Sequence, residues 1–225
     1  MGRLVLFDID GTLIVAGGAG GSAFGRVCET VFHVPDGLRG VQFAGRTDRG
    51  IVREFFTRHH IPPTEENFAR FLDAYVFWLD HLLGRCPGRV LPGVEALLGD
   101  LRALPEPPAI GLLTGNIRLG AEIKLNHFRL WRHFTTGAFG DDHEDRNQLA
   151  GLALERGSRI LKRALKGEEV LVIGDTPLDI HCARAIQAKV LAVATGTFPI
   201  HQLRAHTPNW ALEDLRQVVL KEVCA

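Results

Sequence analysis

The sequence lacks an excess of charge of either sign. Lys and Arg together number 26, and so do Asp and Glu, in a chain of 225 residues. A balanced chain has no general attraction for nucleic acid or for acidic membrane surfaces. Arg46, Arg49 and Arg53 do cluster locally, and we expect them to form a solvated helix face. We therefore expect a protein that does not bind nucleic acid.

Long hydrophobic runs are also missing. No stretch approaches the length that spans a membrane, and the first strand-like run begins too early to leave room for a signal peptide. The four cysteines (Cys28, Cys86, Cys182, Cys224) form no CxxC pair, which favours reduced thiols over a disulfide scaffold. The ten histidines show no metal-binding spacing. We expect a cytoplasmic protein with no membrane contact.

Four short apolar runs, in contrast, predict buried parallel strands. They lie at residues 4–7, 110–113, 170–173 and 190–193. Their hydrophobicity is continuous, as expected where helices cover both faces of a parallel sheet. Helical patterns separate or follow the runs, at residues 94–104, 119–128, 149–165, 178–188 and 212–223. This alternation predicts an α/β fold with a doubly wound parallel sheet.

Residues 16–89 interrupt the alternation with helical patterns alone, at 22–32, 48–60 and 64–83. The last of these carries apolar residues at i, i+3, i+4 spacing, which indicates a helix face packed on a core. Glycines dominate residues 16–21, and a Cys-Pro-Gly segment lies at the other end of the insertion. Flexible ends of this kind predict a hinged cap over an active site. We expect residues 1–15 and 90–225 to form the core domain and 16–89 the helical cap domain.

Polar residues directly follow three of the predicted strands. The first strand stops at Asp8, in Asp8-Ile9-Asp10-Gly11-Thr12, the second at Thr114-Gly115-Asn116, and the third leads to Asp175 and Asp179. The carboxyl ends of parallel strands meet at one edge of the sheet, where ligands bind. Residues that are distant in sequence are therefore predicted to share one crevice.

The residue types in this crevice suit phosphoryl transfer. Asp8 and Asp175 would repel each other without a cation, and Mg²⁺ suits a site with few carboxylates, phosphate and water. A carboxylate can attack phosphorus and form an aspartyl-phosphate. The Thr114 hydroxyl and the backbone N–H groups of Gly115 and Asn116 could hold the phosphoryl oxygens at a helix N-terminus.

These motifs resemble motifs I, II and IV of the haloacid dehalogenase (HAD) superfamily. The likeness is closest to the phosphoglycolate-phosphatase-like branch, in which a helical cap follows the first strand, and it covers nearly the whole chain. It implies a Rossmann-like core, with Asp8 as the nucleophile and Asp10 as the general acid and base. It also implies that Mg²⁺ is held by the Asp8 and Asp175 side chains and by the backbone carbonyl of Asp10. Asp179 would be a ligand through water or a supporting residue.

The family's third motif departs from its usual form, which is a lysine that steadies the nucleophile and the phosphate. No lysine lies between Lys124 and Lys162. Arg146 is the first candidate, because it occupies the usual place and an arginine offers a fixed cation with forked donors. Lys124 is the second candidate, although it lies well into the helix after motif II.

Two further patterns allow other interpretations. Asp141 and Asp145 also fit GDxxxD, but the run before them is less strand-like than residues 170–173, so we expect a solvated loop there. A contact between Asp142 and the site stays open. Gly45-Arg46-Thr47-Asp48 resembles the loop by which such a cap reaches the substrate, although Asp48 could equally cap the following helix.

The expected function is hydrolysis of a small phosphorylated metabolite, with phosphoglycolate or a sugar phosphate as examples. The aspartate at position 10 disfavours a dehalogenase. Residues 16–89 contain no lysine, which disfavours a phosphonatase that would need one in the cap. A phosphomutase of the same superfamily and a non-catalytic binding or regulatory module on the same fold remain open alternatives.

Overall fold

The computed structural model describes residues 4–223 and contains a six-stranded sheet whose neighbouring strands are all parallel. The strand order is β5-β4-β1-β6-β7-β8. The bounds are Leu4–Phe7 (β1), Ala109–Leu113 (β4), Thr136–Ala138 (β5), Val170–Gly174 (β6), Lys189–Val193 (β7) and Trp210–Leu212 (β8). All four predicted strands are present, and the doubly wound α/β prediction is confirmed.

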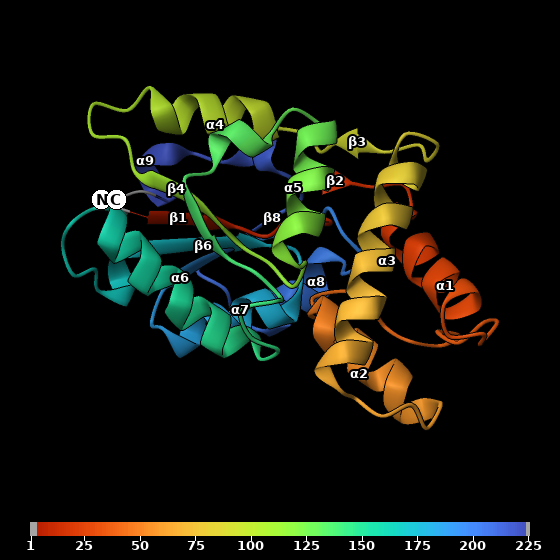
Figure 1. Cartoon of the computed structure of the whole chain (residues 1–225). Helices are drawn as coiled ribbons and strands as arrows, with labels where there is room; N and C mark the ends of the chain where they lie inside the picture. The colour runs from red at the N-terminus through yellow and green to blue at the C-terminus, as the bar shows by residue number, and fades with distance from the viewer. Residues whose placement is uncertain (1–3, 224–225) are drawn as a thin grey trace.

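Helices cover both faces of the sheet (Figure 1). Their bounds are Val94–Arg102 (α4), Arg118–His127 (α5), Arg146–Ile160 (α6), Pro177–Ala185 (α7), Ile200–Ala205 (α8) and Leu220–Val223 (α9). Side chains alternate between the faces of a strand. Val5 and Phe7 of β1 therefore pack with α4 and α5, whereas Leu4 and Leu6 pack with α6, α7 and α8.

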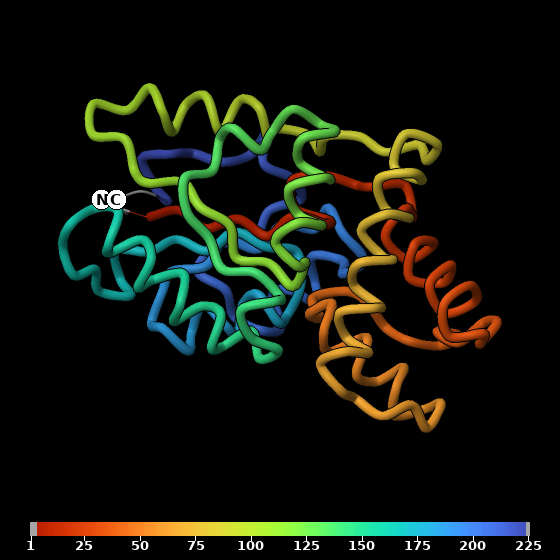
Figure 2. The backbone as a smooth tube through the Cα atoms, viewed as in Figure 1, coloured from red at the N-terminus to blue at the C-terminus, as the bar shows by residue number. Residues whose placement is uncertain are grey.

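Three helices form the insertion, which lies beyond the end of the sheet where β1 stops (Figure 1). They are α1 (Ala19–Thr30), α2 (Asp48–Arg58) and α3 (Glu65–Leu83). The chain leaves the core through β2 (Ile14–Val15) and returns through β3 (Arg89–Val90), and these two strands pair antiparallel (Figure 2). The domain division predicted from the sequence falls at this pair of strands and stays a prediction. We call these three helices and their loops the cap.

Several local predictions were wrong. The helix expected at residues 212–223 is instead the end of β8, a 3₁₀ turn at Leu215–Gln217 and the short α9. Leu212 pairs with Val193 in the sheet, and Asp214 caps the turn by accepting from the Arg216 N–H at 2.8 Å. The helix expected at 149–165 begins at Arg146 and ends at Ile160.

The glycine-rich segment is more ordered than predicted. α1 already begins at Ala19, so Gly20 and Gly21 lie in its first turn. Gly17 and Gly18 alone have positive φ in this segment, at 61° and 84°, and they make the turn into the helix. The predicted flexible junction is therefore a two-residue turn followed by a helix.

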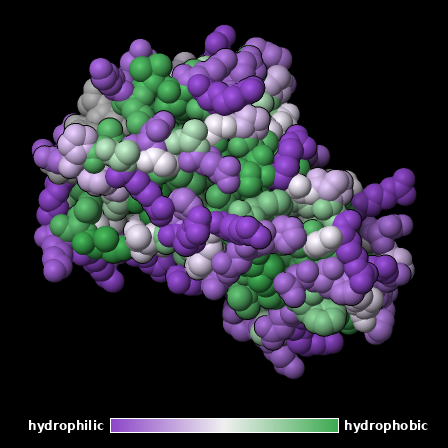
Figure 3. Space-filling view, turned by 90° about the horizontal axis from the view of Figure 1, so that it is seen from above, coloured by the Kyte–Doolittle hydropathy of each residue, from purple (hydrophilic) through white to green (hydrophobic). Residues whose placement is uncertain are grey.

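The surface carries no broad apolar face in the view of Figure 3, where hydrophobic patches are broken up by hydrophilic side chains. Within residues 4–223, no helix has both the length and the apolar character needed to span a membrane. Cys28 and Cys182 are buried and Cys86 is half-buried, all as free thiols. Cys224 lies outside the described residues.

Candidate active site

The three sequence motifs meet at the carboxyl edge of the sheet. Asp8 follows β1, Thr114 follows β4 and Asp175 follows β6, and β1 lies between the other two strands. The Asp8 N–H continues the β-ladder by donating to the Ile173 carbonyl at 2.9 Å. All three side chains are buried. The parallel sheet thus brings together the residues that the sequence predicted to converge.

Asp8, Asp175 and Asp179 form a buried group that we call the carboxylate cluster. One carboxylate oxygen of each residue lies within 4.8 Å of the others. Burial, together with the charge of Asp179, raises the pKa of Asp8 to about 7. Burial, Asp179 and Asp8 raise the pKa of Asp175 well above its usual value. The cluster resists ionisation by itself, and a cation among the oxygens would favour the charged forms.

Backbone packs directly against the Asp175 carboxylate. Thr12 Oγ1 donates to Asp175 Oδ1 at 3.0 Å. A Cβ atom on Gly11 or on Gly196 would lie 2.4 or 1.7 Å from Asp175 Oδ2, so both positions exclude a side chain. Gly11 also has a φ of 88°, which favours glycine. Thr195, which follows β7, joins the two segments because its Oγ1 donates to the Gly11 carbonyl at 2.6 Å.

Asp179 is held from both sides. Thr176 caps α7 and forms a capping box with Asp179, whose Oδ2 accepts from the Thr176 N–H at 3.0 Å and hydroxyl at 2.7 Å. Pro177 is the first residue of the helix, where its missing N–H leaves no helical hydrogen bond unmade. The other oxygen of Asp179 accepts from Arg146. Both oxygens therefore have donors, which suits a supporting residue better than a direct metal ligand.

Arg146 lies against the carboxylate cluster. It is the first residue of α6, which Asp145 caps by accepting from the Asn147 N–H at 2.8 Å. Its buried Nη2 contacts Asp179 and lies 3.6 Å from Asp8 Oδ1. The charges of Asp179 and Asp8 raise the pKa of Arg146 in spite of its burial. Its position is the one that a residue steadying Asp8 would occupy.

Lys124 also reaches the site, by way of Asp10. Its side chain is 5% exposed, and its Nζ donates to Asp10 Oδ2 and to Asn116 Oδ1, each at 2.6 Å. Asn116 Nδ2 donates to the same Asp10 oxygen at 2.9 Å. Asp10 itself is 42% exposed. Lys124 and Arg146 are alternatives by sequence, but in the structure Lys124 lies beside Asp10 and Arg146 beside Asp8.

The Thr114-Gly115-Asn116 segment follows β4 and contributes to the same site as the two aspartate–cation pairs. Thr114 Oγ1 accepts from Asn116 Nδ2 at 2.9 Å, and the buried Thr114 does not itself line the cavity. Gly115 and Asn116 line the cavity above. A Cβ on Gly115 would lie 2.1 Å from the Arg46 carbonyl of the cap, so the cap rests directly on this glycine.

The cap contacts the core through Thr47 and Asp48. The expectation that Asp48 caps α2 was wrong, because Thr47 is the cap and accepts from the Gly50 N–H at 3.2 Å. Asp48 instead donates its N–H to the Gly115 carbonyl at 2.7 Å, and its Oδ2 accepts from the Ile117 N–H at 2.8 Å. Burial raises the pKa of Asp48 to about 7, although Lys124 opposes this shift.

The arginines of α2 make a second cap–core contact. Arg53 forms a two-pronged ion pair with Glu144, at 2.8 and 2.6 Å, and Arg49 Nε lies 3.6 Å from the same carboxylate. Arg46, in the loop before α2, pairs instead with Glu54 of that helix. Glu144 lies in the core loop two residues before Arg146. The prediction of a solvated helix face was therefore wrong for Arg49 and Arg53, because this face meets the core.

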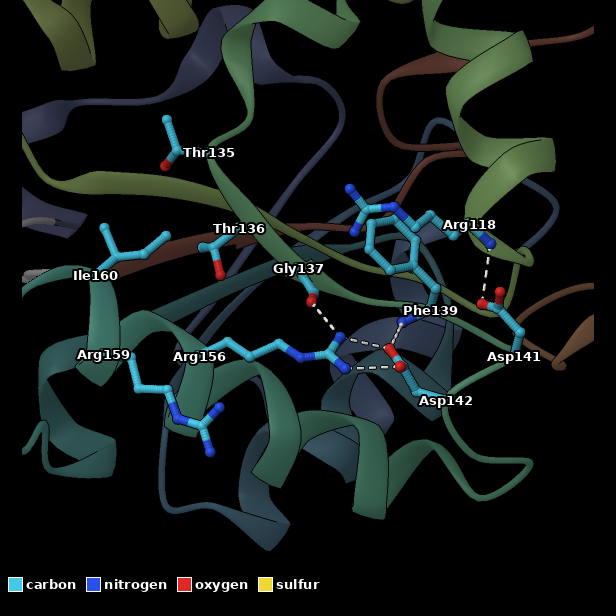
Figure 4. A pocket seen from close by; sticks show the side chains of 10 residues that line it. All are labelled: Arg118, Thr135, Thr136, Gly137, Phe139, Asp141, Asp142, Arg156, Arg159 and Ile160. Carbon is cyan, nitrogen blue, oxygen red and sulfur yellow. Dashed lines mark hydrogen bonds and ion pairs between the residues drawn. The ribbon is translucent and has the colours of Figure 1, made fainter.

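The competing acidic loop has its own partners (Figure 4). Arg156 of α6 pairs with both Asp142 oxygens, at 2.6 and 2.7 Å, and donates to the Gly137 carbonyl of β5 at 2.8 Å. Asp141 accepts from the Arg118 N–H at 2.9 Å. These bonds hold the loop to α6 and α5 beside the sheet edge, in a groove of about 360 Å³. The residues that bind Asp141 and Asp142 in this way, Arg118 and Arg156, do not belong to the carboxylate cluster.

A cavity of about 540 Å³ lies between the carboxylate cluster and the cap. Asp8, Asp10, Gly115, Asn116, Lys124, Arg146 and Asp175 line it from the core. From the cap it is lined mostly by glycine and apolar residues, which the sequence did not assign to the site, together with Arg46 and Asp48. Thr195 and Gly196 also line it, and the strand-end rule applied to β7 would have found them.

The chain matches the family model of the haloacid dehalogenase-like hydrolases over residues 5–193. Among solved structures, a hydrolase from Pseudomonas syringae is 21% identical with a TM-score of 0.74, covering 100% of both chains. A protein described as a predicted phosphoglycolate phosphatase, from Haemophilus somnus 129PT, is 19% identical with a TM-score of 0.70, covering 95% of this chain and 94% of that one. CbbY from Rhodobacter sphaeroides, in complex with phosphate, is 16% identical with a TM-score of 0.74, covering 96% of each. At these identities the likeness establishes the fold.

Among curated proteins, the chain is similar to a bifunctional riboflavin kinase/FMN phosphatase from Arabidopsis thaliana. The two are 23% identical over 191 residues, which make up 84% of this chain and 48% of the other. The chain thus spans about half the length of the curated relative that it matches.

Proposed function

The chain belongs to the haloacid dehalogenase-like hydrolase family, and from this premise we propose that it is a magnesium-dependent phosphatase of small-metabolite phosphate monoesters. The observation that carries the proposal is the pairing of two carboxylates with two cations. Asp8 lies in the carboxylate cluster beside Arg146, and Asp10 lies at the cavity beside Lys124. Such a pair of aspartates in different surroundings suits a nucleophile and a proton carrier.

The residues present fit a magnesium ion. Asp8 and Asp175 would provide carboxylate oxygens, and the backbone carbonyl of Asp10 would provide another. The raised pKa values of Asp8 and Asp175 support this assignment, because they reflect buried carboxylates whose mutual repulsion Arg146 offsets only in part. When bound, Mg²⁺ would neutralise the charge of the transferring phosphoryl oxygens.

In the proposed mechanism, Asp8 accepts the phosphoryl group. A carboxylate oxygen of Asp8 attacks phosphorus, the bond between phosphorus and the ester oxygen breaks, and Asp10 gives its proton to the departing oxygen. Asp10 then takes a proton from a water molecule as that water attacks phosphorus. The bond between phosphorus and Asp8 breaks, which releases inorganic phosphate and restores both carboxyl groups.

The surrounding donors would position these steps. The Arg146 guanidinium, 3.6 Å from Asp8 Oδ1, would hold the nucleophile and face the phosphoryl oxygens, together with the N–H groups of Gly115 and Asn116. Lys124 and Asn116 would hold Asp10 through its Oδ2. The Thr114 hydroxyl, expected from the sequence to bind phosphate, would hold Asn116, because its Oγ1 accepts from Asn116 Nδ2.

Hydrolysis of p-nitrophenyl phosphate, with and without Mg²⁺, tests the proposal. We expect activity that EDTA removes and Mg²⁺ restores, and an Asp175→Asn variant that needs far more Mg²⁺ than the wild type. Asp141→Asn is the matched control, because Asp141 lies in the acidic loop with partners of its own. Absent or EDTA-insensitive turnover would indicate a non-catalytic module or another chemistry. Turnover that requires a bisphosphate activator would indicate a phosphomutase.

A further inference from the structure

Most of the cap side of the cavity is built from glycine and apolar residues, and Arg46 and Asp48 are the charged cap residues that also line it. We call this surface the cap wall. It consists of Gly18, Gly20, Gly21, Phe24, Phe43, Ile51 and Tyr75. The core side carries the charged groups of the proposed reaction. The leaving group of a substrate would therefore meet the cap wall while its phosphate meets the core.

Three aromatic rings give the cap wall its shape. The Phe24 ring lies 4.5 Å from the Tyr75 ring and 5.7 Å from the Phe43 ring, measured between centroids. Phe24 and Tyr75 are each 1% exposed, so packing from α1 and α3 holds them in place. Phe43 is half-buried and comes from the loop before α2. Phe24 and Tyr75 therefore support the ring of Phe43, which is the more exposed of the three and offers apolar surface to a flat group.

The glycines leave open space beside these rings. A Cβ atom on Gly21 would meet no atom within 4 Å, and Gly21 is helical, so neither packing nor a positive φ explains its lack of a side chain. Glycine within a helix costs roughly 0.5–1 kcal/mol relative to alanine. The room that Gly21 leaves is open to a ligand in the cavity.

The cations that line the cavity already have partners. Among residues 4–223, these cations are Arg46, Lys124 and Arg146. Arg46 pairs with Glu54, Lys124 with Asp10, and Arg146 with the carboxylate cluster. The insertion, residues 16–89, supplies no lysine at all. A second anionic group on a substrate would lose its water in this cavity without gaining a free cation.

Asp48 adds an acceptor to the same space. Its carboxylate lines the cavity, and its Oδ2 accepts from the Ile117 N–H. Its Oδ1 has no hydrogen-bond partner within the part of the chain that the structure describes, so it can accept from a hydroxyl or amine of a ligand. An ionised Asp48 would also oppose an anionic leaving group.

On these observations, and resting on the phosphatase activity proposed above, we infer that the cap wall selects the substrate. The preferred substrates are phosphate esters of uncharged alcohols that carry a flat ring and a hydroxyl or amine. Esters whose leaving group carries a carboxylate or a second phosphate, phosphoglycolate among them, are poor substrates. The same chemistry disfavours a bisphosphate activator and therefore a phosphomutase.

Three phosphate compounds separate this inference from the proposed function. Acetyl phosphate is small and depends mainly on the core side, whereas benzyl phosphate and phosphoglycolate are both esters of primary alcohols that differ in ring and charge. We expect kcat/KM for benzyl phosphate to exceed that for phosphoglycolate by at least about tenfold. If acetyl phosphate is hydrolysed and kcat/KM for phosphoglycolate equals or exceeds that for benzyl phosphate, the inference is wrong but the proposed function stands. No turnover of any of the three overturns the proposed function and the inference with it.

Two substitutions test whether the cap wall sets the preference. Phe43→Ala is expected to lower the ratio of kcat/KM for benzyl phosphate to that for acetyl phosphate at least about fivefold. Phe77→Ala is the control, because Phe77 is 65% exposed and does not line the cavity. Gly21→Lys, which adds a cation to the open space, is expected to raise kcat/KM for phosphoglycolate relative to benzyl phosphate. Unchanged ratios in both Phe43→Ala and Gly21→Lys contradict the inference.

Discussion

The two sides of the cavity differ in chemistry and in how the fold builds them. The core side is charged, and its side chains follow the ends of β1, β4 and β6 directly or lie at the start of α6 and in α5. The cap wall is apolar, and it comes from helices and loops that only pack together in the folded cap. We infer that the core side carries the transfer reaction and that the cap wall chooses the leaving group.

The two sides of the cavity also have opposite effects on the stability of the fold. The core side gathers buried carboxylates whose pKa values are raised, which opposes folding at neutral pH when no cation is bound. The cap wall buries aromatic side chains in mutual contact, which favours folding. Substitutions on the two sides should therefore change activity and stability in different ways.

The largest expected effect is on the core side, at Asp8. Asp8→Asn removes the proposed nucleophile and should lower kcat by about 10⁴-fold for every substrate, whatever its leaving group. Steady-state rates with acetyl phosphate and benzyl phosphate measure this. Asp142→Asn is the matched change in the acidic loop and should lower kcat far less. A loss confined to one substrate would place Asp8 in recognition instead.

The next effect is at Lys124, which positions Asp10. Lys124→Met should lower kcat for benzyl phosphate by about 10- to 100-fold, because Asp10 must give a proton to a poor leaving group. The loss should be smaller for p-nitrophenyl phosphate, whose leaving group needs no proton. The ratio of the two kcat values is the measurement. Equal losses for both substrates would mean that Lys124 does not act through Asp10.

Stability of the metal-free protein should change with pH at the core side. The pKa of Asp8 is raised from 3.8 to about 7, so the stability linked to its protonated form is present below pH 4 and lost as pH rises through about 7. Asp8→Asn should therefore raise the Tm at pH 8 by several degrees, which corresponds to on the order of 2 kcal/mol. It should change the Tm little at pH 4.

Thermal melts of both proteins in EDTA at pH 4 and pH 8 would show this effect. Added Mg²⁺ should stabilise the wild type more than Asp8→Asn. A lower Tm for the variant at pH 8 in EDTA would contradict the assignment of the raised pKa.

The smallest effect is expected at the contact that joins the two sides. Glu144→Gln weakens its ion pairs with Arg49 and Arg53, which are partly exposed and worth at most about 1 kcal/mol. KM should rise no more than about fivefold, with kcat nearly unchanged. Glu155→Gln breaks an exposed pair elsewhere, with Arg159, and should leave KM unchanged. A large fall in kcat would mean that Glu144 does more than hold the cap.

The core side could be predicted from the sequence because its geometry is local. A buried parallel strand fixes where its last residue lies, so the sequence itself predicts that Asp8, Thr114 and Asp175 share one edge of the sheet. The strands β5 and β8 were missed because they are short edge strands of three residues each, with little continuous hydrophobicity.

The cap wall could not be predicted in the same way. Tyr75 belongs to a helical stripe that the sequence assigned to a core, and it is buried there as expected, but it also lines the cavity. Periodicity identifies the buried face of a helix, whereas the packing of α1 against α3 decides which ring reaches the cavity. Lys124 was ranked second for a similar reason, since two turns of α5 bring it back to Asn116.

Chemical trapping of the phosphorylated enzyme tests the central claim most directly. The protein would be mixed with Mg²⁺ and acetyl phosphate, quenched, and treated with borohydride, which reduces an aspartyl-phosphate to homoserine. Peptide mass spectrometry should locate homoserine at position 8 and leave Asp10 and Asp175 as aspartate. Substrate turnover without modification at position 8, or with modification at another aspartate, would contradict the account.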